Sequence, residues 1–215
     1  MTRIRIILVD DHVIVRQGLR SLISQEKDLQ VVGEADDGLQ LLDLATQCPA
    51  DVVVIDLKMP NLNGIDASEE IRRRFPLIHI VILTMHADRS YIERAFQVGV
   101  SGYVLKEDGI SEICSAIRHA AKGAHYVSKR VSTQIPALPV KGKSLSNNKH
   151  VLTLRERQVF QLVAEGKTNS EIAELLGISI RTVEGHRAHF MSKLDLKTHV
   201  DFVRYALKHG IFLDE

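Results

Sequence analysis

Cysteine is scarce in this chain, and long apolar runs are missing. The two cysteines, Cys48 and Cys114, lie far apart and outside any metal-ligand spacing. This excludes a disulfide framework, and we expect both to be small buried side chains in a reducing compartment. No run approaches the roughly 18 apolar residues that a membrane-spanning helix needs. The N-terminus begins a strand-like segment without a signal-peptide layout. We expect a cytoplasmic protein with no membrane partner.

Charge is distributed unevenly, although the net charge is only +1. Residues 1–125 carry 14 Lys and Arg against 18 Asp and Glu, a net of −4, and residues 126–215 carry 14 against 9, a net of +5. An acidic part joined to a basic part indicates two functions, the basic part being a candidate for binding a polyanion. Residues 150–215 alone are neutral at 9 against 9, so charge by itself does not identify a DNA-binding domain.

The first 123 residues alternate short apolar runs with helical patterns. Three of the strand candidates are apolar at consecutive positions, which is typical of strands buried on both faces. This predicts an α/β domain with a doubly wound, five-stranded parallel sheet, in which ligands bind beyond the carboxyl ends of the strands. Strands are expected at Ile4–Val9, Leu29–Glu34, Val52–Ile55, Ile78–Thr84 and Gly102–Leu105, and helices at Val13–Ile23, Leu39–Thr46, Ile65–Phe75, Tyr91–Val98 and Ile110–Lys122.

A change of composition after residue 125 predicts the domain boundaries. Residues 126–149 include Pro136 and Pro139, five basic residues and no acidic ones. No apolar periodicity is visible there, which favours a flexible linker. We therefore expect a first domain at 1–125, a linker at 126–149 and a second, small all-α domain at 150–215.

Helix start signals repeat in the second domain. Thr153 with Glu156 and Thr168 with Glu171 both have the form of a capping box. Glu171–Leu176, a turn at Gly177, and Arg181–Leu194 then give the layout of a DNA-binding helix-turn-helix. Further helix boundaries are indicated by Ser179, by Thr198 with Asp201, and by Gly166 and Gly210.

Polar residues at the ends of the predicted strands form a candidate site. Asp10 and Asp11 follow the first strand, and Asp56 follows the third. With a strand order of 2-1-3-4-5 these carboxylates converge, and a hard cation such as Mg²⁺ would neutralise them. Thr84 ends the fourth strand and Lys106 follows the fifth, adding a hydroxyl and an ammonium group. Together these groups suit the transfer of a phosphoryl group.

The same residues carry a resemblance to the receiver domain of two-component response regulators, covering residues 3–123. It implies that Asp56 accepts a phosphoryl group from the phosphohistidine of a sensor histidine kinase. Asp10, Asp11, Asp56 and the backbone carbonyl of Lys58 would hold Mg²⁺. The matching motifs are Val9-Asp10-Asp11-His12, Ile55-Asp56-Leu57-Lys58-Met59-Pro60 with Asn63-Gly64, Leu83-Thr84 and Tyr103-Val104-Leu105-Lys106.

The resemblance also implies roles around the acceptor. Thr84 would contact the phosphoryl oxygens, Lys106 would pair with them, and Tyr103 would be a switch aromatic that turns inward. Lys58 and His86, each two residues beyond a key position, are expected to alter water access to the acyl phosphate. Because Asp56 would react only on itself, we do not expect an enzyme.

Residues 150–212 resemble the LuxR/NarL type of DNA-binding domain, which makes the whole chain similar to NarL/FixJ response regulators. Val183, Phe190 and Leu194 have the spacing of core residues, and His186 with His189 is expected to contact phosphate or pack rather than hold a metal. Glu184-Gly185 differs from many relatives, which often carry Lys or Asn there, and predicts modest affinity per monomer. DNA contacts are expected from Lys167, Asn169, Ser179, Arg181, Thr182, Glu184, Gly185 and Arg187.

A phosphorylation-controlled transcription regulator has three alternatives. An aspartate-nucleophile phosphatase would need a carboxylate where Lys58 stands, and a flavin carrier would need a Gly/Ser/Thr-rich phosphate loop after the first strand. A receiver that works unphosphorylated, through partners alone, stays open. In the leading hypothesis, phosphorylation produces a homodimer that exposes the recognition helix to double-stranded promoter or operator DNA. The dimer would form through the first and fifth helices or through the strand-five face.

Overall fold

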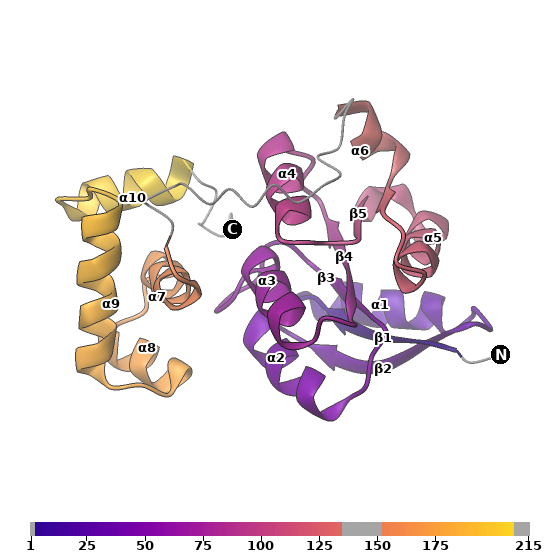
Figure 1. Cartoon of the computed structure of the whole chain (residues 1–215), viewed down its shortest axis with the longest axis horizontal. Coiled ribbons are helices and arrows are strands. Elements are labelled where there is room, and N and C mark those ends of the chain that lie inside the picture. The colour runs from indigo at the N-terminus through magenta and orange to yellow at the C-terminus, as the bar shows by residue number, and fades with distance from the viewer. Residues whose placement is uncertain (1–2, 135–151, 209–215) are drawn as a thin grey trace. The chain divides into compact units, whose positions relative to one another are not determined.

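A computed structural model describes residues 3–134 and 152–208 of the chain, which form two compact units (Figure 1). The first unit is built on a parallel sheet with the strand order β2-β1-β3-β4-β5-β6. The predicted doubly wound α/β fold is therefore confirmed, although the sheet has one strand more than expected. The strands are β1 Ile4–Val9, β2 Leu29–Ala35, β3 Val52–Ile55, β4 His79–Thr84, β5 Gly102–Leu105 and β6 Tyr126–Val127.

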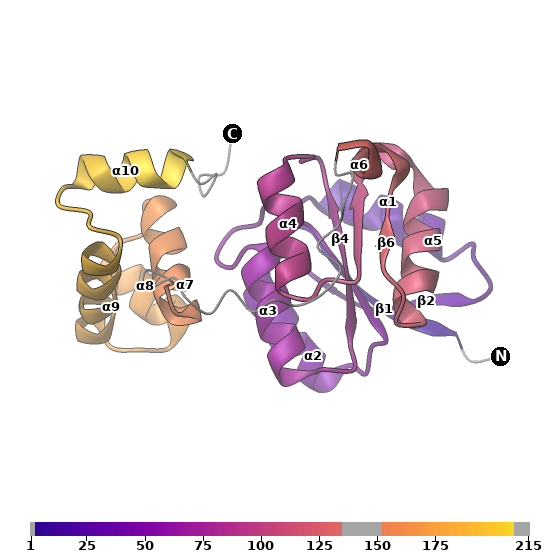
Figure 2. The same ribbon diagram turned by 45° about the horizontal axis from the view of Figure 1, so that its top comes forward.

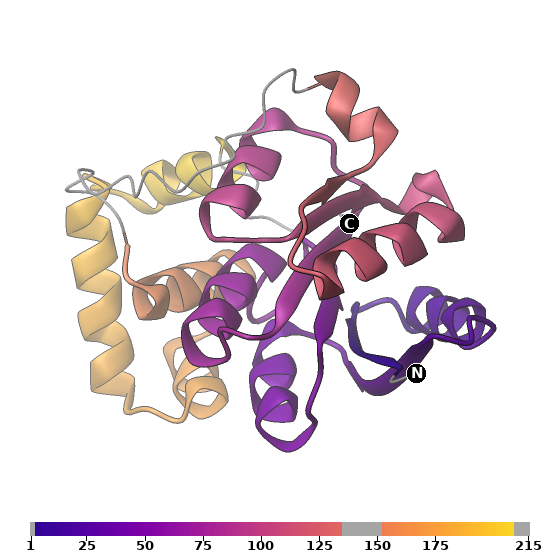
Figure 3. The ribbon, with the colours of Figure 1, turned by 45° about the vertical axis from the view of Figure 1, so that its right-hand side comes forward.

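Helices cover both faces of this sheet. α1 and α5 lie on one face, and α2, α3 and α4 lie on the other (Figures 2 and 3). Alternate side chains of the central strands pack against α5, where Ile113 and Ile117 join the same apolar cluster as Val54 and Val81. The helix bounds are α1 Val13–Ile23, α2 Gly38–Gln47, α3 Gly64–Arg74, α4 Arg89–Gln97 and α5 Ile110–Ala121.

The segment after α5 differs from the flexible linker that was expected there. Residues 126–134 were expected to begin a flexible linker, but they form β6 and a short helix, α6 (Lys129–Gln134). β6 continues the sheet because Tyr126 N donates to Ser101 O at 2.9 Å and Ser128 N donates to Tyr103 O at 3.1 Å. A strand of two residues gives no apolar run, so its pattern could not be recognised in the sequence. The remaining linker residues expected to be flexible, 135–149, lie outside the described residues.

The second unit is helical, as predicted. α7 (Leu154–Ala164) and α8 (Asn169–Leu176) both begin with the expected capping boxes. Gly177 ends α8 in the left-handed conformation, with φ of 62°, and this turn leads into α9 (Ile180–Lys193) and then α10 (His199–Lys208). The predicted C-terminal glycine Gly210 lies outside the described residues.

An aromatic cluster forms the core of the second unit. The ring of Phe160 on α7 lies 5.1 Å from that of Phe190 on α9 and 4.7 Å from that of Phe202 on α10. Val183 and Phe190 are buried, as their spacing predicted, and Leu194 is half-buried. Across residues 3–134 and 152–208, no helix has both the length and the apolar character to cross a membrane.

Candidate functional site

The carboxyl ends of three strands bring two carboxylates and one ammonium group together. Asp10 follows β1, Asp56 follows β3, and Lys106 follows β5. Lys106 Nζ lies 2.7 Å from Asp10 Oδ2 and 2.8 Å from Asp56 Oδ2. Both carboxylates are buried, with exposed fractions of 3% and 6%. Three of the predicted site residues thus form one hydrogen-bonded cluster at this edge of the sheet.

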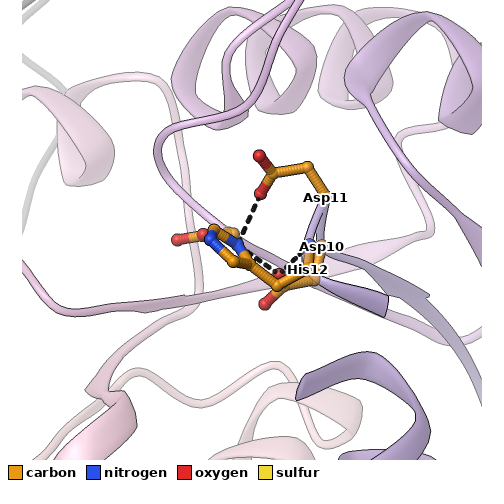
Figure 4. Close-up of side chains that lie close together, drawn as sticks. Asp10, Asp11 and His12 are labelled. Carbon is orange, nitrogen blue, oxygen red and sulfur yellow. Dashed lines mark hydrogen bonds and ion pairs between the residues drawn. The ribbon is translucent and has the colours of Figure 1, made fainter. Parts of the chain in front are cut away.

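Asp11 and His12 complete one side of the cluster (Figure 4). His12 Nδ1 lies 2.9 Å from Asp11 Oδ1 and 3.3 Å from Asp10 Oδ1, and His12 N donates to Asp10 Oδ1 at 2.9 Å. No role was predicted for His12. Its position directly after the aspartate pair was the available signal, because the backbone at the start of a helix turns the next side chain back towards the strand end.

The cluster fits a small, hard cation. Asp10, Asp11, His12 and Asp56 each offer one ligand atom within 4.8 Å of the others. Asp10 and Asp56 contact the ammonium group of Lys106, whereas Asp11 Oδ1 contacts His12 Nδ1, so three carboxylates converge beside one lysine. Carboxylate oxygens with spare lone pairs are the ligands that Mg²⁺ prefers. The residues present therefore match the metal predicted from the sequence.

The charge of Asp56 is set by opposing effects. Burial raises the pKa of its carboxyl above the ordinary value, and the nearby Asp10 adds to this, although Lys106 and the N–H of Leu57 act the other way. Leu57 N donates to Asp56 Oδ1 at 2.7 Å. Burial lowers the pKa of Lys106, but the carboxylates of Asp56 and Asp10 outweigh it and raise the pKa overall. Lys106 is therefore a fixed positive charge beside Asp56.

Gly64 allows the chain to pass close behind Asp56. Gly64 N donates to Leu57 O at 2.9 Å, and a Cβ at this position would lie 2.0 Å from the Asp56 carbonyl oxygen. No other residue fits that space. Asn63 then begins α3, since its side chain accepts from Asp66 N at 3.0 Å. The Asn63-Gly64 pair therefore fixes the loop that follows Asp56.

Thr84 and Tyr103 contact the same short stretch after β4. Thr84 is fully buried, and its Oγ1 accepts from His86 N at 3.3 Å. Tyr103 is also fully buried, and its hydroxyl donates to His86 O at 2.8 Å, so the ring faces inward. Burial raises the pKa of the Tyr103 hydroxyl, which stays protonated as a donor. The half-buried Lys58 lies in the loop after β3, and the role of its carbonyl stays a prediction.

The predicted DNA contacts lie on α8 and α9. Arg181, Thr182 and Glu184 are exposed on the first turns of α9. Ser179 caps this helix, as its hydroxyl accepts from Thr182 N at 3.1 Å. At the start of α8, Lys167 is half-buried. This end of α9 therefore presents a mixed polar surface.

Two of the predicted DNA contacts bind each other. Arg187 Nη1 donates to Asn169 Oδ1 at 2.7 Å, which links α9 to the start of α8. Gly185 has no atom within 4 Å of a would-be Cβ, so packing does not require glycine there. The pKa of His186 is lowered by burial and by Arg155. In the parts of the chain that the structure describes, the one metal-ligand grouping is that of the aspartate cluster, and His189 does not belong to it.

A receiver with an aspartate–lysine pocket, joined to a helix-turn-helix unit, defines the class of response regulators. Residues 6–118 match the family described as the response regulator receiver domain, and residues 150–206 match the bacterial regulatory proteins of the luxR family. The chain belongs to the NarL/FixJ family of response regulators, which are DNA-binding transcription regulators.

Whole-chain relatives agree with this assignment. The chain is 37% identical over 209 residues to the transcriptional regulatory protein MctR of Rhizobium johnstonii, covering 97% of this chain and 95% of that protein. It is 35% identical over 210 residues to the oxygen regulatory protein NreC of Staphylococcus carnosus, covering 95% and 97%. Among solved structures, the response regulator RcsB in complex with DNA is similar, with a TM-score of 0.60, 28% identity, and coverage of 96% and 98%.

Proposed function

We propose that the chain is a phosphorylation-controlled regulator in which Asp56 accepts a phosphoryl group from the phosphohistidine of a sensor histidine kinase. The observation that carries this proposal is the pairing of Lys106 Nζ with both Asp10 Oδ2, at 2.7 Å, and Asp56 Oδ2, at 2.8 Å. A buried nucleophile, a fixed cation and a metal-binding carboxylate are needed at one point for phosphoryl transfer. A regulator of this kind, acting on promoter DNA, works in the cytoplasm.

In the transfer, a carboxylate oxygen of Asp56 bonds to phosphorus while the donor's P–N bond breaks and its electron pair returns to the imidazole. Negative charge gathers on the equatorial phosphoryl oxygens. Lys106 would leave Asp56 Oδ2 and pair with one of these oxygens, and the Thr84 hydroxyl would donate to another. No general base is required, because the Asp56 carboxyl reacts in its ionised form.

Asp10, Asp11, Asp56 and the backbone carbonyl of Lys58 would hold Mg²⁺, which supplies positive charge to the phosphoryl oxygens when bound. The ligand atoms of Asp10, Asp11 and Asp56 lie within 4.8 Å of one another, which supports this arrangement. Without this positive charge, the three carboxylates would repel an incoming anionic donor.

Thr84 and Tyr103 would couple the phosphoryl group to the rest of the receiver. Both hold the backbone of His86, one through its N–H and one through its carbonyl oxygen. If Thr84 moves towards the phosphoryl group, its bond to His86 N is lost and the segment after β4 can rearrange around Tyr103. Shifting such an equilibrium from 1:99 to 99:1 takes about 5.5 kcal/mol, which dimerisation and DNA binding would share with the acyl phosphate.

The phosphorylated form would dimerise and place two copies of α9 in the major groove at half-sites about one helical turn apart. A solved structure of the relative RcsB holds two dimers bound to two parallel DNAs, which supports a homodimer and a DNA partner for this chain. The residues proposed to contact DNA are Lys167, Asn169, Ser179, Arg181, Thr182, Glu184, Gly185 and Arg187.

The test is DNA binding by the wild-type chain and by Asp56→Ala, each with and without acetyl phosphate and Mg²⁺. A sequence-selected DNA pool supplies the ligand. We expect acetyl phosphate to increase the affinity of the wild type alone. Equal binding by both proteins in all conditions would leave the DNA-binding unit in place but remove phosphorylation control.

Lys58 and His86 are proposed to set the lifetime of the acyl phosphate by altering the access of water. Both are half-buried and lie on the two loops that border the pocket. Dephosphorylation of the Lys58→Ala, His86→Ala double variant is expected to differ in rate from that of the wild type, as followed with radiolabelled phosphoprotein. Equal rates would remove this role.

A further inference from the structure

A second buried cation lies just outside the phosphoryl pocket. Arg16 is on the first turns of α1 and is 9% exposed, whereas Arg20 on the same helix and most of the other described arginines of the receiver are exposed. Burying a guanidinium is costly unless several groups receive its protons. The burial of Arg16 therefore indicates that its hydrogen bonds have a specific role.

The contacts of Arg16 connect three elements around the first strand end. Its Nη1 donates to the backbone carbonyl oxygen of Asp10, at the end of β1. Its Nε lies 3.4 Å from Glu34 Oε2, near the end of β2, and its Nη2 lies 2.6 Å from Asp36 Oδ1, just beyond that strand. The guanidinium thus ties the β1–α1 junction to the neighbouring strand.

Asp10 is the residue whose position this arrangement fixes. Its carboxylate contacts Lys106 Nζ and accepts from His12 N, while its carbonyl is held from the other side by Arg16. The backbone is therefore clamped at the point where the side chains of Asp10 and Asp11 diverge. Metal ligands keep their geometry only when such supporting hydrogen bonds orient them.

We propose that Arg16 is a positioning residue for the metal-binding carboxylates, acting through the Asp10 carbonyl; this rests on the proposed function. Arg16 does not touch the metal or the phosphoryl group. It sets the backbone from which Asp10 and Asp11 reach the metal, so its loss weakens metal binding while the pocket keeps its full set of ligands. Loss of a residue that orients metal ligands typically weakens metal affinity by about 10–100-fold.

A purely electrostatic effect of Arg16 predicts the opposite change in metal affinity, so the two explanations can be distinguished. Removing a positive charge near a site for a divalent cation should strengthen cation binding. Arg16→Met is therefore expected to bind metal more tightly if Arg16 acts only as a charge, and more weakly if it positions the ligands. Arg16→Lys keeps the charge but cannot span the carbonyl and both carboxylates with one planar group.

Arg20 offers a matched control one turn along the same helix. Its Nη1 lies 2.5 Å from Glu34 Oε1, so it shares a partner with Arg16, but it is exposed and its side chain reaches Glu34 rather than Asp10. Arg20→Met removes the same charge and a neighbouring ion pair. It should leave metal affinity within twofold of the wild type.

The experiment measures Mn²⁺ binding to the full, unphosphorylated chain by the electron paramagnetic resonance signal of free Mn²⁺, with thermal unfolding of each variant recorded in EDTA. We expect Arg16→Met and Arg16→Lys to raise the dissociation constant about tenfold or more. Phosphorylation by acetyl phosphate in these variants should recover at saturating Mg²⁺, which a damaged fold would not allow.

Each outcome has one meaning. Unchanged or tighter Mn²⁺ binding by both Arg16 variants would overturn the positioning role. Equal weakening in the Arg20 variant would also overturn it, by assigning the effect to the helix or to Glu34. If Arg16→Met does not fold, the Mn²⁺ affinity of Arg16→Lys alone tests the positioning role. A wild-type chain that binds no Mn²⁺ would instead count against the proposed function.

Discussion

At the scale of single residues, Asp56 keeps its charge in a place where ionisation is costly. Burial and the neighbouring Asp10 raise the pKa of its carboxyl, and Lys106 offsets this only in part. A carboxyl whose pKa is higher in the folded than in the unfolded state binds its proton more tightly when folded. The ionisation of this carboxyl therefore lowers the free energy of unfolding as the pH rises through the raised pKa. If Asp56 is the acceptor, as proposed, its readiness to react lowers the stability of the fold.

Asp56→Asn is accordingly expected to stabilise the metal-free receiver at pH 7, by on the order of 1 kcal/mol, as is common when a functional compromise is removed. Lys106 keeps a partner, because Asp10 Oδ2 lies 2.7 Å from its Nζ. Urea unfolding followed by circular dichroism, with EDTA present, measures the difference. The gain should shrink as the pH falls through the raised pKa of Asp56, because the wild-type carboxyl then becomes protonated. A variant less stable than the wild type at pH 7 would contradict this account.

Gly64→Ala tests the close approach behind the acceptor. The added Cβ would meet the Asp56 carbonyl oxygen at 2.0 Å, so the loop must shift. We expect a loss of about 1–3 kcal/mol in the free energy of unfolding, as for other overpacked sites, together with slower phosphorylation by acetyl phosphate. Gly18→Ala is the control, because nothing lies within 4 Å of its would-be Cβ in the middle of α1. Equal effects of the two substitutions would remove the steric argument.

At the scale of elements, α9 carries a glycine that its packing does not need. Gly185 lies in the helix interior with open space around it, and glycine there costs about 1 kcal/mol relative to alanine. We expect Gly185→Ala to stabilise the second unit by about that amount in thermal unfolding. If the glycine serves close approach of the backbone to DNA, the same substitution lowers operator affinity. A lower unfolding temperature for Gly185→Ala would contradict the open space around this position.

Element boundaries could be predicted from the sequence wherever the signal was local. The capping boxes at Thr153 and Thr168 involve residues three apart, so they were visible in the sequence, and both helices begin as expected. The pocket was also predictable, because Asp10, Asp56 and Lys106 each follow an apolar strand whose end had to meet the others at one edge.

Contacts between distant segments could not be predicted in this way. The hydrogen bond from Tyr103 to the His86 carbonyl depends on one rotamer packed among buried neighbours. The bond between Arg187 and Asn169 depends on how α8 and α9 cross. In the same unit, Arg155 on α7 donates to the Leu176 carbonyl at the end of α8 at 2.6 Å. Tertiary packing decides these pairs, and no spacing in the sequence encodes them.

At the scale of the whole molecule, the first unit carries the proposed phosphoryl site and the second carries the helix-turn-helix. Dimerisation is proposed to bring two copies of the chain together on DNA. A fragment of residues 150–215 should bind the selected operator about 100-fold more weakly than the phosphorylated full chain, since linking two reading heads raises their effective concentration. Fluorescence anisotropy with labelled DNA, alongside sedimentation of the free proteins, measures both affinity and oligomeric state. Equal affinity of a monomeric fragment and the full chain would exclude dependence on dimerisation.

The sixth strand has a practical consequence for dividing the protein. β6 covers the outer side of β5 through the bonds from Tyr126 N to Ser101 O and from Ser128 N to Tyr103 O. A receiver cut after residue 125, the boundary that composition favoured, would leave the carbonyls of this apolar strand open to other chains. Uncovered apolar edges pair with one another and promote aggregation. Solubility of an isolated receiver should therefore depend on keeping the residues up to 134.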